Sequence, residues 1–149
     1  MTANVKQLIF DPTKCIGCRL CEQWCVLTHF NATNPKKARI RIHRAMDSQE
    51  ESAEYCHQCE NPPCIESCKF DALTQDPVTL QIIVNAEKCT GCQLCRIKCP
   101  YHAPILHPEK KLILICDLCG GQPKCIEHCP ESAITYAYRI QEKEGGNTQ

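Results

Sequence analysis

The sequence predicts an α+β fold of short strands and short helices that bound metal holds together. Three observations support this expectation. Sixteen of the 149 residues are cysteines, and they fall into four groups of four. The segments between the groups are short β-branched or aromatic runs of strand length. Apart from the cysteines, the chain has one Trp and three Phe, so apolar burial alone would stabilise it poorly.

The four cysteine groups share one pattern. Each consists of a C-x2-C pair followed by a C-x3-C pair, and a proline follows each of the last two groups. The groups are Cys15, Cys18, Cys21 and Cys25; Cys56, Cys59, Cys64 and Cys68; Cys89, Cys92, Cys95 and Cys99; and Cys116, Cys119, Cys125 and Cys129.

This spacing suits a cubic iron–sulfur cluster. The third group, with Pro100, reads C-x2-C-x2-C-x3-C-P, which is the bacterial [4Fe–4S] run, and the first group matches it without the proline. Three thiolates a few residues apart wrap one corner of a cube, while Gly17 and Gly91 let the main chain approach closely. Four complete groups therefore predict four [4Fe–4S] clusters.

Two other uses of cysteine fit less well. A disulfide framework belongs to oxidising compartments, and the first ten residues show no basic region, extended apolar run or twin-arginine pair. We therefore expect a cytoplasmic protein. Structural zinc sites bring two C-x2-C pairs together over a longer spacer. No apolar run approaches the roughly 18 residues of a membrane span.

Charge and motifs exclude further classes. The 17 Lys and Arg balance the 17 Asp and Glu, and four clusters would each add about −2, which disfavours nucleic-acid binding. The sequence shows no phosphate-binding glycine loop, no H-E-x-x-H and no cysteine outside the four groups. We therefore expect a protein without a catalytic site of its own.

The secondary structure follows the cysteine groups. We expect strands before the first, third and fourth groups and after the fourth, at 5–10, 80–84, 111–115 and 133–138. The segment 69–88 reads as strand, Asp-Pro turn and strand, a hairpin. Segments 20–30 and 94–98 are expected to form one or two helical turns each, and the polar tail 141–149 to fray.

Residues outside the cysteine groups have weaker signals. The basic stretch 36–44 is expected to be a solvated edge strand protected by its charges; a docking strip or charge compensation for nearby clusters is the alternative. The aromatic and imidazole side chains are expected to pack or to tune the clusters rather than to bind iron. They are Trp24, Tyr55, Tyr101, His29, His43, His57, His102, His107 and His128.

With these four groups in this order, the chain resembles the ferredoxin-type electron-transfer subunits of molybdenum and tungsten oxidoreductases over about residues 5–138. Similar small subunits serve aldehyde:ferredoxin oxidoreductase, formate dehydrogenase, DMSO reductase and carbon monoxide dehydrogenase. Many members have a long insertion in the fourth group, a signal or a membrane anchor. Here five residues separate Cys119 from Cys125, which implies a soluble, shortened version.

In that family two groups form one ferredoxin unit with two clusters and exchanged fourth ligands. The hairpin between groups two and three implies an inserted unit at 51–103, nested in an outer unit of 1–50 plus 104–140, with pseudo-twofold symmetry. Serial pairing of groups one with two and three with four is the alternative. Nesting implies set A (Cys15, Cys18, Cys21, Cys129), set B (Cys25, Cys116, Cys119, Cys125), set C (Cys56, Cys59, Cys64, Cys99) and set D (Cys68, Cys89, Cys92, Cys95).

The resemblance implies a non-catalytic subunit that relays single electrons through four [4Fe–4S] clusters in a row. One end would meet a catalytic subunit, with a molybdenum or tungsten enzyme such as an aldehyde oxidoreductase favoured. The other would meet a flavoprotein, a ferredoxin or a further copy of the chain, stacked end to end. The alternatives are a free-standing polyferredoxin serving carbon monoxide dehydrogenase or hydrogenase, and a metallated scaffold or maturation factor.

Overall fold

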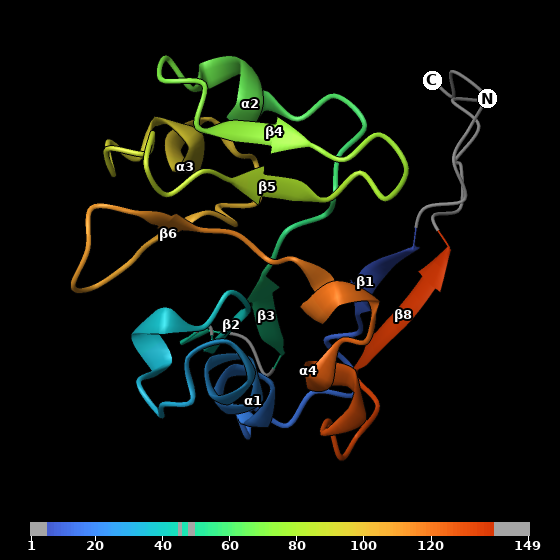
Figure 1. Cartoon of the computed structure of the whole chain (residues 1–149). Helices are drawn as coiled ribbons and strands as arrows, with labels where there is room; N and C mark the ends of the chain where they lie inside the picture. The colour runs from blue at the N-terminus through green and yellow to red at the C-terminus, as the bar shows by residue number, and fades with distance from the viewer. Residues whose placement is uncertain (1–5, 45, 48–49, 139–149) are drawn as a thin grey trace.

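The computed structural model describes residues 6–44, 46–47 and 50–138. Short elements alternate along them (Figure 1). They are β1 (Lys6–Phe10), α1 (Leu20–Phe30), the 3-10 turn η1 (Pro35–Lys37), β2 (Arg41–Arg44), β3 (Glu51–Glu54), α2 (Pro63–Ser67), β4 (Leu73–Gln75), β5 (Ile82–Val84), α3 (Leu94–Lys98), β6 (Ile105–Leu106), β7 (Ile113–Leu114), the 3-10 turn η2 (Leu118–Gly121), α4 (Lys124–Glu127) and β8 (Ile134–Tyr138).

The strands form four separate two-stranded antiparallel sheets, β1–β8, β2–β3, β4–β5 and β6–β7. In the first, Lys6 lies opposite Tyr138 and Phe10 opposite Ile134, which joins the two ends of the described chain. In Figure 1 the sheets β1–β8 and β2–β3 lie in the lower half with α1 and α4, and β4–β5 lies in the upper half with α2 and α3. Helix α1 packs on α4, and α2 on α3.

The apolar core is divided into two clusters of buried side chains, and cysteines belong to both. The first cluster comprises Leu8, Cys21, Cys25, Ile40, Ile42, Tyr55, Leu118, Cys125 and Ile134. The second comprises Cys56, Cys64, Leu73, Ile82, Cys95, Cys99, Ala103, Ile113 and Ile115. Cys116 packs against both. Neither core closes without its cysteine side chains, as the thin apolar composition indicated.

The expected strands are confirmed, although most are shorter than predicted. The predicted hairpin is also present: β4 and β5 pair with Thr74 opposite Ile83. In its turn the carboxylate of Asp76 accepts hydrogen bonds from the amides of Val78 and Thr79, at 2.8 and 2.9 Å. Residue 5 and the tail 141–149 lie outside the described residues.

Helix α1 is longer than the expected one or two turns. Its 11 residues lie between Arg19 and Asn31, and these two flanking residues adopt the left-handed conformation. The Asn31 amide donates to the Leu27 carbonyl. The length comes from tertiary packing, because its buried face faces α4. The Glu22 carboxylate of α1 is also buried, at 5 % exposure, and it accepts a hydrogen bond from the Ile42 amide of β2 at 2.9 Å.

The basic stretch 36–44 forms η1 and β2, and β2 pairs only with β3 among the described strands. The edge strand is therefore confirmed, but its charges are paired with acids. Arg41 bonds to Glu54 at 2.6 Å, and Arg44 bonds to Glu51 at 2.9 Å. Within the described residues, no helix has the length and apolar character of a membrane span.

The first core gives a stability prediction. Ile134, 2 % exposed, fills the space between β8 and the first cluster, so Ile134→Ala should lower the free energy of unfolding by about 2–5 kcal/mol. The matched control is Ile83→Ala, since Ile83 is also a strand isoleucine but is 52 % exposed. Anaerobic urea unfolding followed by circular dichroism measures both. Equal losses would contradict the assignment of Ile134 to the core.

Candidate iron–sulfur centres

Three of the four predicted cysteine sets line cavities. Set A surrounds one together with Phe10, Ile42 and Ile134, set C a second, and set D a third. Their empty volumes are about 330, 340 and 310 Å³. The cavities are thus of equal size although the spacing within the groups varies, and each is lined almost wholly by sulfur and apolar atoms.

The thiols of set B also lie together. The charges of Cys25 and Cys125 act on Cys116, and those of Cys119 and Cys25 act on Cys125. The structure therefore brings the thiols of sets A, C and D together around one cavity each, and it places those of set B within electrostatic reach of one another and of Cys56. This proximity shows which thiols could bind the same cluster. The assignment of ligands to clusters stays a prediction.

Burial changes the chemistry of these thiols. Loss of solvent raises the pKa of Cys21, Cys56, Cys64 and Cys125 to about 12 each. It also raises the pKa of Cys95 to about 11 and that of Cys116 well above its ordinary value. Neighbouring thiolates add to the effect in each case. Several thiolates in one such cavity therefore require a compensating cation.

The backbone follows one rule in all four groups. The second residue after the first cysteine has a positive φ, at Gly17 (71°), Gln58 (49°), Gly91 (71°) and Leu118 (56°). At three of them the amide donates to the sulfur of that first cysteine, at 3.4–3.5 Å. The turn thus points main-chain donors at sulfur, which stabilises a thiolate.

The sequence analysis singled out only the two glycines of these four positions, for close approach of the main chain. Gln58 and Leu118 adopt it with full side chains, which costs on the order of 1–2 kcal/mol each. Their side chains are 0 % and 2 % exposed, and the Gln58 amide group donates to the Cys116 carbonyl at 3.1 Å. Their burial and this bond offset the cost, and a non-glycine residue gives no such signal in the sequence.

Electrostatic interactions between thiols link set A to set B, set B to set C and set C to set D. Cys21 of set A interacts electrostatically with Cys125 of set B. Cys116 of set B likewise interacts with Cys56 of set C, and Cys64 of set C with Cys95 of set D. The two exposed cysteines, Cys18 and Cys92, belong to sets A and D. Solvent therefore reaches the two ends of the row.

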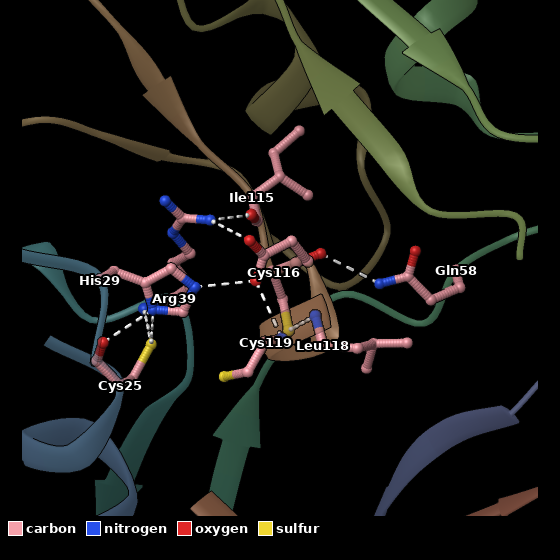
Figure 2. A network of polar contacts seen from close by, with 9 residues as sticks. Cys25, His29, Arg39, Gln58, Ile115, Cys116, Leu118 and Cys119 are labelled. Carbon is pink, nitrogen blue, oxygen red and sulfur yellow. Dashed lines mark hydrogen bonds and ion pairs between the residues drawn. The ribbon is translucent and has the colours of Figure 1, made fainter. Parts of the chain in front are cut away.

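A polar network surrounds set B (Figure 2). The backbone amide of Arg39 donates to Cys25 Sγ at 3.3 Å, and the Nη1 atom of the Arg39 side chain donates to the Ile115 carbonyl at 3.0 Å. The same Nη1 lies 3.5 Å from Asp117 Oδ2. Asp117 also accepts a hydrogen bond from the Cys119 amide at 3.0 Å. Sequence reasoning included Arg39 in the basic stretch 36–44, for which charge compensation of nearby clusters was the alternative, but it did not single out Asp117, which lies far away along the chain.

His29 joins this network as a cation. Its Nδ1 lies 2.8 Å from the Cys25 carbonyl oxygen and its Nε2 lies 2.8 Å from Asp117 Oδ1. Both oxygens only accept hydrogen bonds, so both ring nitrogens must donate. In agreement, the hydrogen bond to Asp117 and further bonds to Cys25 raise the pKa of His29 to about 10. The same Nδ1 lies 3.8 Å from Cys25 Sγ, a contact through which His29 could tune a cluster.

Other aromatic side chains form ring stacks beside the cysteines. His57 stacks between Tyr55 and Tyr101, with ring centroids 4.5 and 3.6 Å apart. Trp24 stacks on His128 at 3.5 Å. His57 and Tyr101 line the cavity of set C. The His57–Tyr101 stack therefore packs beside this candidate centre.

The residues present fit [4Fe–4S] clusters. Each set offers four sulfurs, three cavities have equal size, and backbone amides point at the thiols. His29, Asp117 and Cys119 have ligand atoms within 4.8 Å of one another and could hold a single ion. That use would leave the other thiols of set B without a role, so the fit favours a cluster.

Comparisons with known proteins agree with this chemistry. The 4Fe–4S dicluster domain matches residues 48–139. The chain belongs to the 4Fe–4S dicluster domain family. It is therefore an iron–sulfur protein of the ferredoxin type, as the cysteine groups predicted.

Two relatives of this chain are named as a polyferredoxin-like subunit and as a putative electron transport protein. The chain is similar to the aliphatic sulfonate oxidoreductase, polyferredoxin-like subunit of Pyrococcus furiosus. The two are 40 % identical, and the match covers 84 % of this chain and 72 % of the relative. The chain is also 37 % identical to the putative electron transport protein YsaA of Escherichia coli, over 85 % of this chain and 86 % of that relative. The active site complex BamBC of benzoyl coenzyme A reductase has a similar fold, with TM-score 0.54, 24 % identity and coverage of 91 % of this chain and 80 % of that one.

The turn geometry yields a prediction about Gly91. A Cβ there would lie 3.0 Å from the Lys111 backbone, whereas one at Gly120, which has the same φ of 71°, would meet nothing within 4 Å. Gly91→Ala should therefore lower iron content and the thermal midpoint, while Gly120→Ala should pay only the cost of its φ, about 1–2 kcal/mol. Iron assay and thermal melting of both variants would check this. A variant at Gly91 that matched the Gly120 variant would contradict the close approach.

Proposed function

We propose that this chain is an electron-transfer subunit that carries four [4Fe–4S] clusters, one on each of sets A to D. The row of four cysteine sets, with an exposed cysteine at each end, is the observation that carries the proposal. Bound clusters would supply one-electron redox chemistry. Electrons would enter near Cys18 or Cys92 and leave at the other end, with no bond chemistry on this chain.

The chain's own residues prepare this function. Apolar side chains such as Phe10 and Ile134 exclude water from the cavity of set A, and Ile82 and Ile115 do so at set C. Backbone amides donate to the sulfurs, which favours the charged ligands. Polar groups and solvent access near each set would fix its potential. The Cys sets thus differ in environment although they share one ligand type.

The nested arrangement of two ferredoxin units belongs to the same proposal. Support comes from the β1–β8 sheet, which joins the flanks of groups one and four, and from the β4–β5 hairpin between groups two and three. The two cores support it for most of their buried residues, because the first draws mainly on the predicted outer unit and the second on the inserted one. Three residues depart from the predicted boundaries: Ile113 and Ile115 of the outer unit pack in the second core, and Tyr55 of the inserted unit packs in the first.

The partner at one end is proposed to be a catalytic oxidoreductase subunit. The polyferredoxin-like name of the Pyrococcus relative and the family resemblance both favour this, with a molybdenum or tungsten enzyme as the first candidate. The other end would meet a flavoprotein, a ferredoxin or another copy of the chain. The second candidate function is a free-standing polyferredoxin, which would co-purify with no partner at fixed stoichiometry.

Ligand exchange between groups gives a prediction that separates nested from serial pairing. If Cys99 completes set C, then Cys99→Ser and Cys59→Ser should alter the same cluster signal in electron paramagnetic resonance of the reduced protein. Serial pairing instead places Cys99 with the fourth group, so that Cys99→Ser and Cys119→Ser would share one altered signal. The second result would contradict the nested proposal.

Cluster content tests the function itself. Anaerobically purified chain should hold about sixteen iron and sixteen acid-labile sulfide atoms, and coulometric titration should load about four electrons, one per cluster. A zinc-bearing protein with little sulfide would refute the proposal. A protein with full iron and sulfide content that accepts no electrons in the coulometric titration would favour a scaffold or maturation factor instead.

A further inference from the structure

Arg39 is bonded to both halves of set B. Its backbone amide donates to Cys25 Sγ, while its guanidinium donates to the carbonyl of Ile115 and pairs with Asp117, the two residues that flank Cys116. The side chain is only 16 % exposed. Its Nε is buried without a hydrogen-bond partner among the described residues. A permanent positive charge is therefore fixed beside these thiols, with one donor still to be satisfied.

Arg39 supplies the positive charge beside set B. Its guanidinium is always protonated, and the carboxylate of Asp117, with which it pairs, is 44 % exposed. The poorly exposed Arg39 side chain is therefore screened less by water and salt than a surface charge. Since a cluster gains one negative charge on reduction, a positive neighbour stabilises its reduced form.

Set A has neighbours of the opposite sign. The buried carboxylates of Glu22 and Glu51, each 5 % exposed, act on Cys21 and Cys15 respectively. Arg44 pairs with Glu51, but its side chain is 76 % exposed and is therefore well solvated. Negative charge beside a cluster disfavours its reduction. Sets A and B, adjacent in the row, thus differ in the sign of their surroundings.

We propose that Arg39 raises the reduction potential of set B above that of set A, so that set B is the first of these two neighbouring centres to be reduced. The inference depends on the proposed function, because it requires clusters on sets A and B. It assigns set B, rather than set A with its exposed Cys18, as the centre that holds the electron when the two share one. Arg39 acts on the cluster through its charge and is a positioning residue for Cys25.

The test is a redox titration of the anaerobic holo-protein followed by electron paramagnetic resonance. Iron content is measured first, and Cys119→Ser identifies the signal of set B. Arg39→Gln should lower the midpoint potential of set B. At a fixed potential the ratio of reduced to oxidised set B cluster should fall about tenfold, which corresponds to about 59 mV for one electron. Arg39→Lys keeps the charge and should restore most of the shift.

Two further variants act as controls. Arg41→Gln removes a neighbouring arginine of similar exposure, 22 %, that pairs with Glu54, and it should leave the set B midpoint unchanged. Asp117→Asn removes the anion and keeps an oxygen that can accept from the Cys119 amide. Measured below the ordinary pKa of histidine, about 6.5, so that His29 keeps its proton without Asp117, it should raise the midpoint. This opposite shift tests the charge effect even where Arg39→Gln loses its cluster.

The outcomes separate the two proposals. A normal cluster content with a set B midpoint that neither Arg39→Gln nor Asp117→Asn moves would overturn the role of Arg39 and leave the electron-transfer function standing. So would a set A cluster, identified by the signal that Cys18→Ser alters, that is reduced at a higher potential than set B. Wild-type protein without iron and sulfide would instead overturn the function, and the inference with it.

Discussion

The desolvation of cysteine thiols constrains the whole structure. Cys56, Cys64 and Cys125 lie in apolar surroundings that raise the pKa of each to about 12, so a cavity without metal favours neutral thiols. Four thiolates become stable there only when iron supplies positive charge, and binding must then release protons. Because the same cysteines belong to both apolar cores, the free energy of metal binding is also free energy of folding. Core and redox site are one structure in this chain.

The division into two cores explains how one small chain can hold a row of centres. Each core is built around the cysteines of two sets, and Cys116 touches both. A single large core would bury the centres without giving them an order. Two adjoining cores instead place sets B and C at their junction and leave Cys18 and Cys92 exposed at the ends. Differences in potential along such a row must come from the polar groups around each set, since the ligands are alike.

Much of this could be predicted from the sequence because ligand spacing is a local property. The three cysteines at the start of each group must share one turn, and the strand–turn–strand pattern at 69–88 fixes the β4–β5 hairpin. The positive φ of Leu118 could not be predicted, since only burial in the first core offsets its cost. The bonds among His29, Arg39 and Asp117 join residues up to 88 positions apart, and no spacing rule connects them. The length of α1 likewise depends on packing against α4.

The most direct test is diffraction from anaerobic crystals of the holo-protein at wavelengths on both sides of the iron absorption edge. The account predicts four separate groups of anomalous iron density in a row, each bounded by one of sets A to D. Cys18 and Cys92 would lie at the two ends. Density for two clusters only, clusters bounded by cysteines of other sets, or an anomalous signal at the zinc edge would contradict it.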